Sequence, residues 1–186
     1  MGLIDRLSSH ELKELISKCW ITHDGMWFAH TLFESGIETT NHLNRAAIKS
    51  MAAVELERFM KVLAVSKTDL QSFPAFVSFF SDVADILIPD FMNVTISFDA
   101  PNTVRWEFNE RGCFAFNGVK MLSVEKDYEC GVLYRIQCWL DILEISFEMT
   151  PAVTHCVMPK NGECKGMFRL WPPNESAARP AHSYTG

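Results

Sequence analysis

Apolar residues recur at a helical period through the first part of the chain. Residues 9–22 begin at two serines, Ser8 and Ser9, either of which can cap a helix, and their apolar side chains stand three and four positions apart. Residues 26–33 continue an apolar and aromatic helix that Gly36 can end, because glycine readily adopts the left-handed backbone found after many helices. The pattern predicts a first helix, a step at the sequence THDG, and a second helix.

Further helices complete a helical half, residues 1–90. Residues 37–63 place small and apolar side chains at three-and-four spacing, as in one long helix or two. Residues 73–88 are strongly apolar and stop at Pro89, whose ring cannot continue a helix. Five phenylalanines in and beside this segment are many for one monomer to bury, which makes it a candidate dimer interface. They are Phe73, Phe76, Phe79, Phe80 and Phe91.

The second half of the chain changes to a strand period. Residues 93–98 and 103–108 alternate apolar and polar positions on either side of a turn sequence, which predicts a hairpin. Residues 113–116 suggest a short third strand or a turn back across the sheet. One inserted helix is expected over residues 129–145.

Two more strands are expected at residues 153–158 and 164–171, joined by the turn PKNGE. Helices first and a strand meander afterwards predict an α+β fold, in which the helical half packs on an antiparallel sheet with one inserted helix. Residues 91–171 form the α+β half of one compact unit. Residues 172–186 are rich in proline and small polar residues, so we expect a disordered tail.

Composition narrows the class of protein. The chain has 186 residues, 48% of them hydrophobic, and a net charge of −6, with no cluster of Lys and Arg that would grip nucleic acid. It has neither a signal peptide nor a stretch of ~20 apolar residues that would span a membrane. We therefore expect a cytoplasmic protein that binds neither nucleic acid nor membrane. In that compartment its six cysteines are expected as thiols or metal ligands.

Three cysteines have a spacing that predicts a metal site. Cys130 lies at the start of the inserted helix, and Cys156 and Cys164 flank the PKNGE turn. A helix N-terminus lowers a thiol pKa, and soft thiolates favour zinc or iron. His155, Glu129 or a water could supply a fourth ligand. The remaining cysteines, Cys19, Cys113 and Cys138, are interpreted as small buried hydrophobes.

The stretch CWITHDGMWFAH, residues 19–30, is the second candidate site. Helical spacing sets acidic, imidazole and indole side chains along one edge, as in a pocket with an aromatic wall. The alternative is a packing anchor, with the tryptophans in the core and a hydrogen-bonded kink around Gly25. The expected pocket residues are Trp20, His23, Asp24, Trp27, His30, Trp106 and Trp139, and His23 and Asp24 are the candidate catalytic pair.

Two resemblances accompany these patterns. A cysteine, a helix and then CVMPKNGECKGMF resemble the 4-vinyl-reductase-type domain, a small α+β module of ligand-sensing proteins. In phenol-responsive members the equivalent cysteines bind zinc beside an aromatic-effector pocket, which implies Cys130, Cys156 and Cys164 here. The acidic ligand of that family falls near Val153, which cannot coordinate a metal.

The second resemblance covers other segments. WITHDGMWF, GIETTNHLN and CWLDIL resemble a large uncharacterised prokaryotic family near the L-2-amino-thiazoline-4-carboxylate hydrolase group. Our leading hypothesis is a protein that binds a small organic molecule beside a thiolate metal site. The alternatives are a metal-dependent hydrolase of a small carboxylated or amide-like substrate, in which His23 and Asp24 would activate water, and a structural or partner-binding homodimer.

Overall fold

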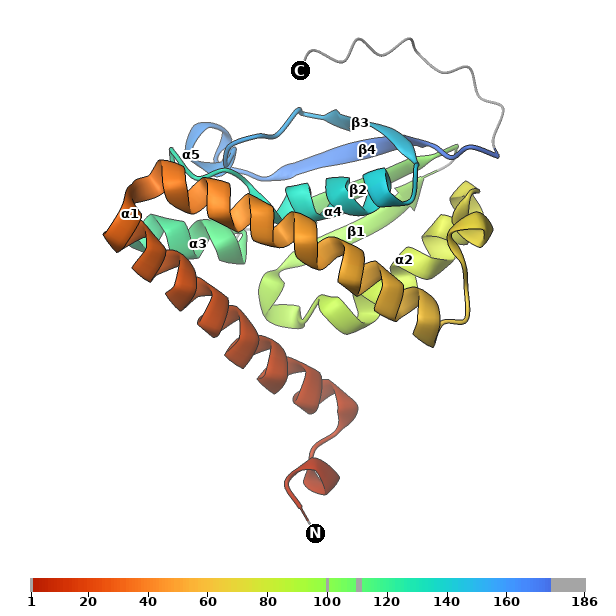
Figure 1. Ribbon diagram of the computed structural model, residues 1–186, viewed down its shortest axis with the longest axis horizontal. Helices are drawn as coiled ribbons and strands as arrows, with labels where there is room; N and C mark the ends of the chain where they lie inside the picture. Colours follow the sequence, from red (N-terminus) through yellow and green to blue (C-terminus); the bar gives the residue numbers. More distant parts are fainter. Residues whose placement is uncertain (1, 100, 110–111, 175–186) are drawn as a thin grey trace.

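The protein is an α+β molecule in which helices pack against a four-stranded antiparallel sheet (Figure 1). The computed structural model describes residues 2–99, 101–109 and 112–174. The predicted fold class is confirmed.

The first element, α1, spans Ser9–Val62 and consists of two helices that meet at a kink. A capping box begins it: the Ser8 hydroxyl accepts from the Glu11 N–H, and the Glu11 carboxylate accepts from the Ser8 N–H. The helix runs through Gly25. A glycine in a helix interior costs ~1 kcal/mol of helix stability, which is less than the helical turns on either side contribute. Its break is at Gly36, with φ 75° and ψ 170°. The step predicted at THDG is therefore wrong, and we call residues 9–35 the N-terminal arm.

The second helix, α2, spans Phe73–Leu87, close to the prediction. The Ser72 hydroxyl accepts from the Ala75 N–H at its start. Its apolar face is buried inside the single chain, which removes the reason for placing a dimer interface here. The buried residues of that face are Phe76, Phe79, Phe80 and Val83. Three short 3₁₀ turns flank these helices: η1 (Ile4–Arg6), η2 (Lys67–Leu70) and η3 (Asp90–Met92).

The sheet has the order β1-β2-β4-β3, with every pair antiparallel. The predicted hairpin is present, and the last strand begins one residue later than predicted. The strand expected at residues 153–158 is wrong, because the third strand precedes this segment. The strands are β1 (Val94–Asp99), β2 (Thr103–Phe108), β3 (Ser146–Thr150) and β4 (Lys165–Trp171).

Three helices fill the second half: α3 (Phe114–Met121), α4 (Gly131–Ile142) and the short α5 (Met158–Asn161). The helix α4 is the predicted inserted helix. The helix α3 replaces the strand or turn expected at residues 113–116, because four apolar residues do not distinguish a strand from the first turn of a helix.

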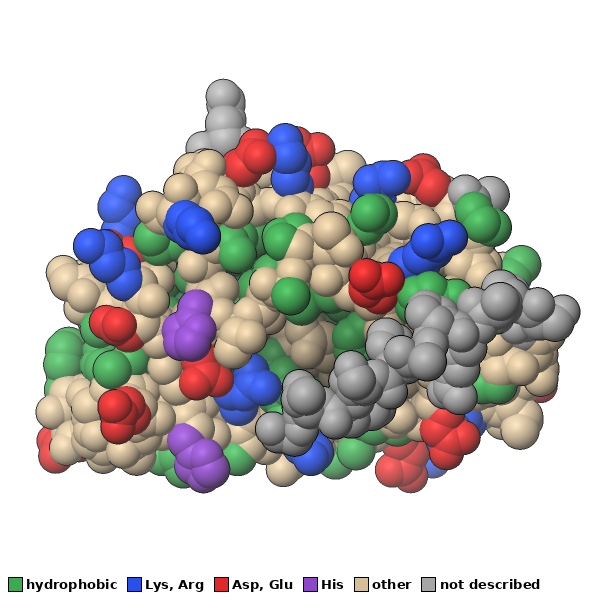
Figure 2. Space-filling model, turned by 90° about the horizontal axis from the view of Figure 1, so that it is seen from above, with side chains coloured by type: hydrophobic (Ala, Val, Ile, Leu, Met, Phe, Trp, Pro, Cys, Tyr) green, Lys and Arg blue, Asp and Glu red, His purple; other side chains and the backbone are tan. Residues whose placement is uncertain are grey.

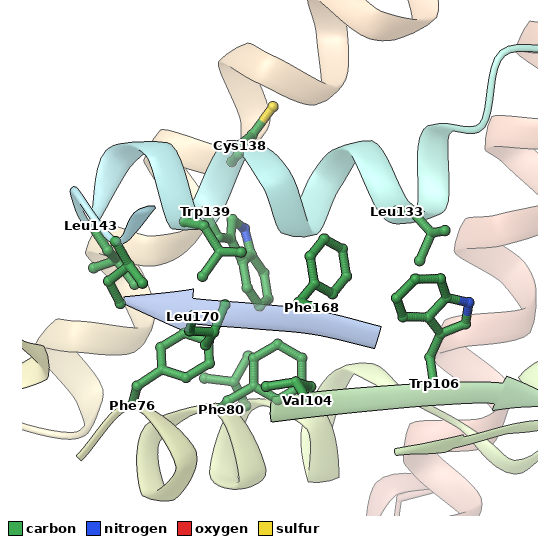
Figure 3. Close-up of a cluster of buried hydrophobic side chains, with 14 of the residues drawn as sticks. Phe76, Phe80, Val104, Trp106, Leu133, Cys138, Trp139, Leu143, Phe168 and Leu170 are labelled. Carbon is green, nitrogen blue, oxygen red and sulfur yellow. The ribbon is translucent and has the colours of Figure 1, made fainter. Parts of the chain in front are cut away.

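The core forms where α4 lies over β4 and meets α2 (Figure 3). Trp139 of α4 contacts Phe80 of α2 edge to face, with ring centroids 6.1 Å apart. Leu133 and Leu143 point from α4 toward the strands, whereas Cys138 points to the other side of the helix (Figure 3). Cys138 is thus the buried hydrophobe that the sequence predicted.

The predicted tail begins later than residue 172. Pro172 is buried, and the Asn174 N–H donates to the Gln71 carbonyl at 3.1 Å. Residues 175–186 of the predicted tail lie outside the described residues. Within the described part of the chain, no helix combines the length and apolar character needed to cross a membrane. Acidic and basic side chains are interspersed over the face shown in Figure 2.

Candidate metal centre

Four cysteines gather around the starts of α3 and α4. Cys113 and Cys130 are the residues that precede these two helices. The charges of Cys130 and Cys164 would raise the pKa of Cys113, and those of Cys164 and Cys156 would raise the pKa of Cys130, so the four sulfurs are close enough to interact. We call Cys113, Cys130, Cys156 and Cys164 the thiol cluster.

Backbone pairing holds three members of the thiol cluster in place. The Cys130 N–H donates to the Thr154 carbonyl at 2.8 Å, and the Cys156 N–H donates to the Tyr128 carbonyl at 2.9 Å. The Cys164 carbonyl accepts from the Phe108 N–H at 3.0 Å. The segment after β3 is thereby tied to the start of α4, and the start of β4 to the end of β2.

Every sulfur of the cluster has N–H groups that favour its thiolate form. Burial raises the pKa of Cys164 overall, and the Trp106 indole N–H, which is buried without an ordinary hydrogen-bond partner, acts against that rise. Donors of this kind surround metal-bound thiolates in proteins. The backbone donors are Ala115 and Phe116 to Cys113, Val132 and Leu133 to Cys130, and Met158 to Cys156.

Burial opposes ionisation at all four thiols. It raises the pKa of Cys113 to about 12 and that of Cys130 to about 11, and it raises the pKa values of Cys156 and Cys164 as well. With raised pKa values the four groups are neutral thiols near neutral pH. They would ionise together only with a cation such as a soft divalent metal ion to offset the charge.

The sulfurs are gathered but do not stand at coordination distance. Among the described residues, only His10, Glu14 and Asp90 bring three ligand atoms within 4.8 Å of one another. A tetrahedral Zn–S site with bonds of ~2.3 Å sets its sulfurs about 3.8 Å apart. Metal binding would therefore draw the four sulfurs inward.

The sequence identified three of the four thiols and missed Cys113. The start of a helix at Phe114 was the available signal, but residues 113–116 were interpreted as a strand. His155 is exposed and pairs through a backbone bridge with Glu129, whereas the adjacent Cys156 is half-buried. The structure thus brings Cys113, and not the His155 imidazole, to the buried thiols.

An open cleft of ≈ 330 Å³ lies between α1 and α4, next to the thiol cluster. Its central group is Arg45, whose Nε lies 3.2 Å from a Glu129 carboxylate oxygen and whose guanidinium stacks 3.6 Å from the Tyr134 ring. Glu129 directly precedes Cys130, so adjacent residues belong to the cleft and to the cluster. The lining residues are Glu38, His42, Arg45, Ala46, Glu129 and Tyr134.

The single aromatic pocket predicted from the tryptophans is wrong. Trp20 and Trp27 are 62% and 66% exposed on the N-terminal arm, whereas Trp106 and Trp139 are buried in the core. The remaining predicted pocket residues, His23, Asp24 and His30, are exposed on the same arm. A helix face was correctly predicted, but nothing in its pattern indicated that it faces solvent.

His23 and Asp24 are neighbours on the surface of the arm. The His23 Nδ1 lies 3.7 Å from an Asp24 oxygen, and both side chains are about three-fifths exposed. The His23 ring stacks on Trp20 with centroids 5.9 Å apart and meets the edge of Trp27 at 6.5 Å. These contacts lack the water-excluding surroundings that general acid–base catalysis favours.

A second group of ligand atoms joins the arm to η3. His10 Nε2 lies 3.6 Å from an Asp90 carboxylate oxygen, and the Asp90 N–H donates to Glu14 at 2.6 Å. Lys18 pairs with the same Glu14 carboxylate at 3.7 Å. The i, i+4 spacing of His10 and Glu14 was visible in the sequence, but Asp90 joins them only through the fold.

Fold and site together define an α+β protein with a buried thiol cluster beside a charged cleft. Residues 5–79 match the model of a family of unknown function (DUF6125). The matched part contains all of α1, including the arm, and the first part of α2 up to residue 79, but it ends before the thiol cluster. No curated protein and no solved structure matches the chain.

Proposed function

We propose that this protein binds a small organic molecule in the cleft at Arg45, beside a metal ion held by the thiol cluster. The observation that carries the proposal is the backbone pairing that brings Cys130, Cys156 and Cys164 together from separate segments, with Cys113 at the start of α3 close enough for its charge to interact with theirs. The resemblance to the 4-vinyl-reductase-type domain supports three of these ligands, and Cys113 takes the place of the acidic ligand that Val153 cannot provide. Zinc or iron suits four thiolates.

A four-thiolate site is closed, so its expected role is structural. It would tie the starts of α3 and α4 to the segment that carries Cys156 and to the start of β4. Glu129, one residue before Cys130, would be held against Arg45 as a result. The metal would thus set the geometry of one wall of the cleft.

The cleft favours a ligand with an anionic group. The Arg45 guanidinium covers one face of the Tyr134 ring and pairs with Glu129 through Nε, so a ligand carboxylate would be held by its remaining N–H groups. Two acidic residues, Glu38 and Glu129, line the same cleft and would repel a ligand of purely negative charge. A small, flat carboxylic acid with a hydrogen-bond donor fits this arrangement better than the purely apolar molecule expected from the sequence.

Elemental analysis of the purified protein tests the metal centre. We expect about one zinc or iron per chain, and we expect Cys113→Ser to lose most of it because three thiolates no longer close the site. Cys19→Ser is the matched control, since Cys19 is exposed on the arm. A metal content that is unchanged in Cys113→Ser would contradict the proposed centre.

Thermal unfolding in the presence of small aromatic carboxylic acids tests the cleft. A ligand at 100 times its Kd stabilises the folded state by ≈ 2.7 kcal/mol, so the melting temperature should rise by several degrees. Arg45→Ala should abolish the rise, whereas Arg58→Ala, a change at an exposed arginine of the same helix, should retain it. An equal rise in both variants would place the ligand elsewhere.

One observation favours the hydrolytic alternative. His10, Glu14 and Asp90 offer three nitrogen and oxygen ligands and would leave positions open for water, as catalytic metal sites do. Metal analysis of Glu14→Gln distinguishes the two proposals. Loss of metal there, with metal retained in Cys113→Ser, would favour a hydrolase over the thiolate centre.

A further inference from the structure

A broad apolar face of the N-terminal arm is open to solvent. Figure 1 shows the arm as the red helix that runs away from the sheet. Six large apolar side chains on it are between 46% and 70% exposed, although a soluble protein would usually cover such a face. They are Leu15, Ile16, Trp20, Met26, Trp27 and Phe33.

Helical geometry puts these six side chains on one face. At 3.6 residues per turn they occupy about 140° of the helix circumference, and residues 15–33 place no Lys, Arg, Asp or Glu within that arc. The other side of the arm meets the body of the molecule, where Phe28 contacts Tyr128 at 5.6 Å and Ala29 is buried. The arm therefore has two apolar faces, and the chain itself covers one of them.

The open face is large enough for a stable interface. Trp20, Trp27 and Phe33 are each about two-thirds exposed, which corresponds to roughly 400 Å² of aromatic surface. The three aliphatic side chains, about half exposed, add roughly 200 Å². The sum approaches the ≈ 800 Å² that each partner buries in a standard interface, and flanking polar groups supply the rest.

We propose that this face pairs antiparallel with the same face of a second copy of the chain. The sequence of the arm has the three-and-four spacing of a helix that packs along a partner helix. The positions with this spacing are Leu12, Ile16, Cys19, His23, Met26, His30 and Phe33. The two histidines, His23 and His30, occupy central positions of this row, and the aromatic residues flank them.

A second row of side chains, beside the row that faces the partner helix, specifies the orientation of the pair. Lys13, Trp20, Trp27 and Glu34 repeat every seven residues. An antiparallel pair centred near His23 sets Trp20 against Trp27 of the second copy, and Lys13 against its Glu34. A parallel pair would instead place the two copies of this row on opposite sides of the helix seam, where neither the Trp20–Trp27 contact nor the Lys13–Glu34 pair can form.

Lys13 and Glu34 lie at the two ends of the arm, and their pairing requires the Lys13 ammonium to leave its contacts within the chain. In the single chain the Lys13 ammonium donates to the carbonyl oxygens of Asp85 and Ile88, which are uncharged partners. Glu34 is exposed at the other end of the arm. Because a two-fold axis repeats each contact, the antiparallel arrangement gains two Lys13–Glu34 pairs and closes at two copies.

A second copy fits the face better than a groove on the body would. The two clefts described in the chain are lined mainly by polar and charged side chains, so neither offers an apolar surface as broad as this face. The arm of a second copy, running antiparallel, supplies an apolar surface that matches the open face. The pairing is independent of the metal centre, because the arc contains only one cysteine, Cys19, which is outside the thiol cluster.

Sedimentation velocity of the full chain tests the proposal. We expect the wild-type protein to sediment at twice the mass of one chain, and Trp20→Glu/Trp27→Glu to sediment as a monomer with unchanged helical circular dichroism. Met121→Glu is the matched control, since Met121 is 87% exposed on α3 outside the arm and should remain dimeric. A monomeric wild type, or a dimeric double variant, would overturn the proposal.

A charge exchange tests the orientation. Glu34→Lys should weaken the dimer at least several-fold at low salt, because two like charges then face each other at each end. Lys13→Glu/Glu34→Lys should restore dimerisation, since the opposite charges again face each other in the antiparallel pair. If the exchange does not improve on Glu34→Lys, the antiparallel arrangement is wrong.

Discussion

Gly166→Ala is expected to destabilise the protein by about 3 kcal/mol, because the new methyl group has no space. Its Cβ would lie 2.5 Å from the Thr150 carbonyl oxygen and 2.5 Å from the Trp106 ring. Gly166 faces Trp106 across the β2–β4 pair, and β3 lies on its other side. Neither the backbone carbonyl nor the buried indole can move freely. Urea unfolding followed by tryptophan fluorescence measures the loss.

The matched control is a glycine with free space around it. A Cβ at Gly118, inside α3, would meet nothing within 4 Å. Gly118→Ala should therefore stabilise the protein by roughly 0.5–1 kcal/mol through helix propensity. If the two variants unfold at the same urea concentration, the close approach at Gly166 is not a packing constraint. Because Trp106 also interacts with Cys164, the proposed metal centre predicts a lower metal content in Gly166→Ala as well.

Glu55→Ala is expected to cost about 2 to 3 kcal/mol of unfolding free energy. The Glu55 carboxylate joins α1 to α4: it forms a two-armed ion pair with Arg135 and accepts from the Trp139 indole N–H at 3.1 Å. All of these contacts are at least partly buried, so the alanine leaves a guanidinium and a buried N–H without their acceptor. Chemical denaturation of both proteins measures the difference.

Glu57→Ala separates this effect from a general effect of charge. Glu57 is exposed on the same helix, and a surface substitution of this kind typically changes stability by no more than about 0.5 kcal/mol. Glu55→Gln should fall between the two, because the amide oxygen can still accept from Trp139 but no longer carries charge. A Glu55→Ala variant as stable as Glu57→Ala would show that the link between α1 and α4 contributes little.

Elements with a long and regular period were predictable. The helices α2 and α4 and the hairpin of β1 and β2 lie close to their predicted bounds, because each repeats its apolar residues over enough positions to distinguish a period of 3.6 from one of 2. Short segments were not predictable in this way. The segment at residues 113–116 begins a helix, and residues 153–158 contribute one bridge rather than a strand.

The candidate site was predictable only in part. The spacing of Cys130, Cys156 and Cys164 indicated that the three could meet, because a turn and a helix start are local features. Cys113 lies 17 residues before Cys130 and reaches the cluster through the tertiary placement of the start of α3 near Cys130 and Cys164, which no local pattern specifies. The Arg45 cleft is similar, since it combines residues from α1 with Glu129 and Tyr134.

The sequence by itself determined which faces of the helices are apolar, where the hairpin turns, and which cysteines neighbour a turn. It did not determine which apolar faces the chain buries. The phenylalanines of α2 lie in the core and the tryptophans of the arm lie in solvent, although both sets have the same helical spacing. Periodicity reports only the direction in which a side chain leaves its own helix. Burial depends on what the rest of the chain brings to that side, and this only the tertiary structure decided.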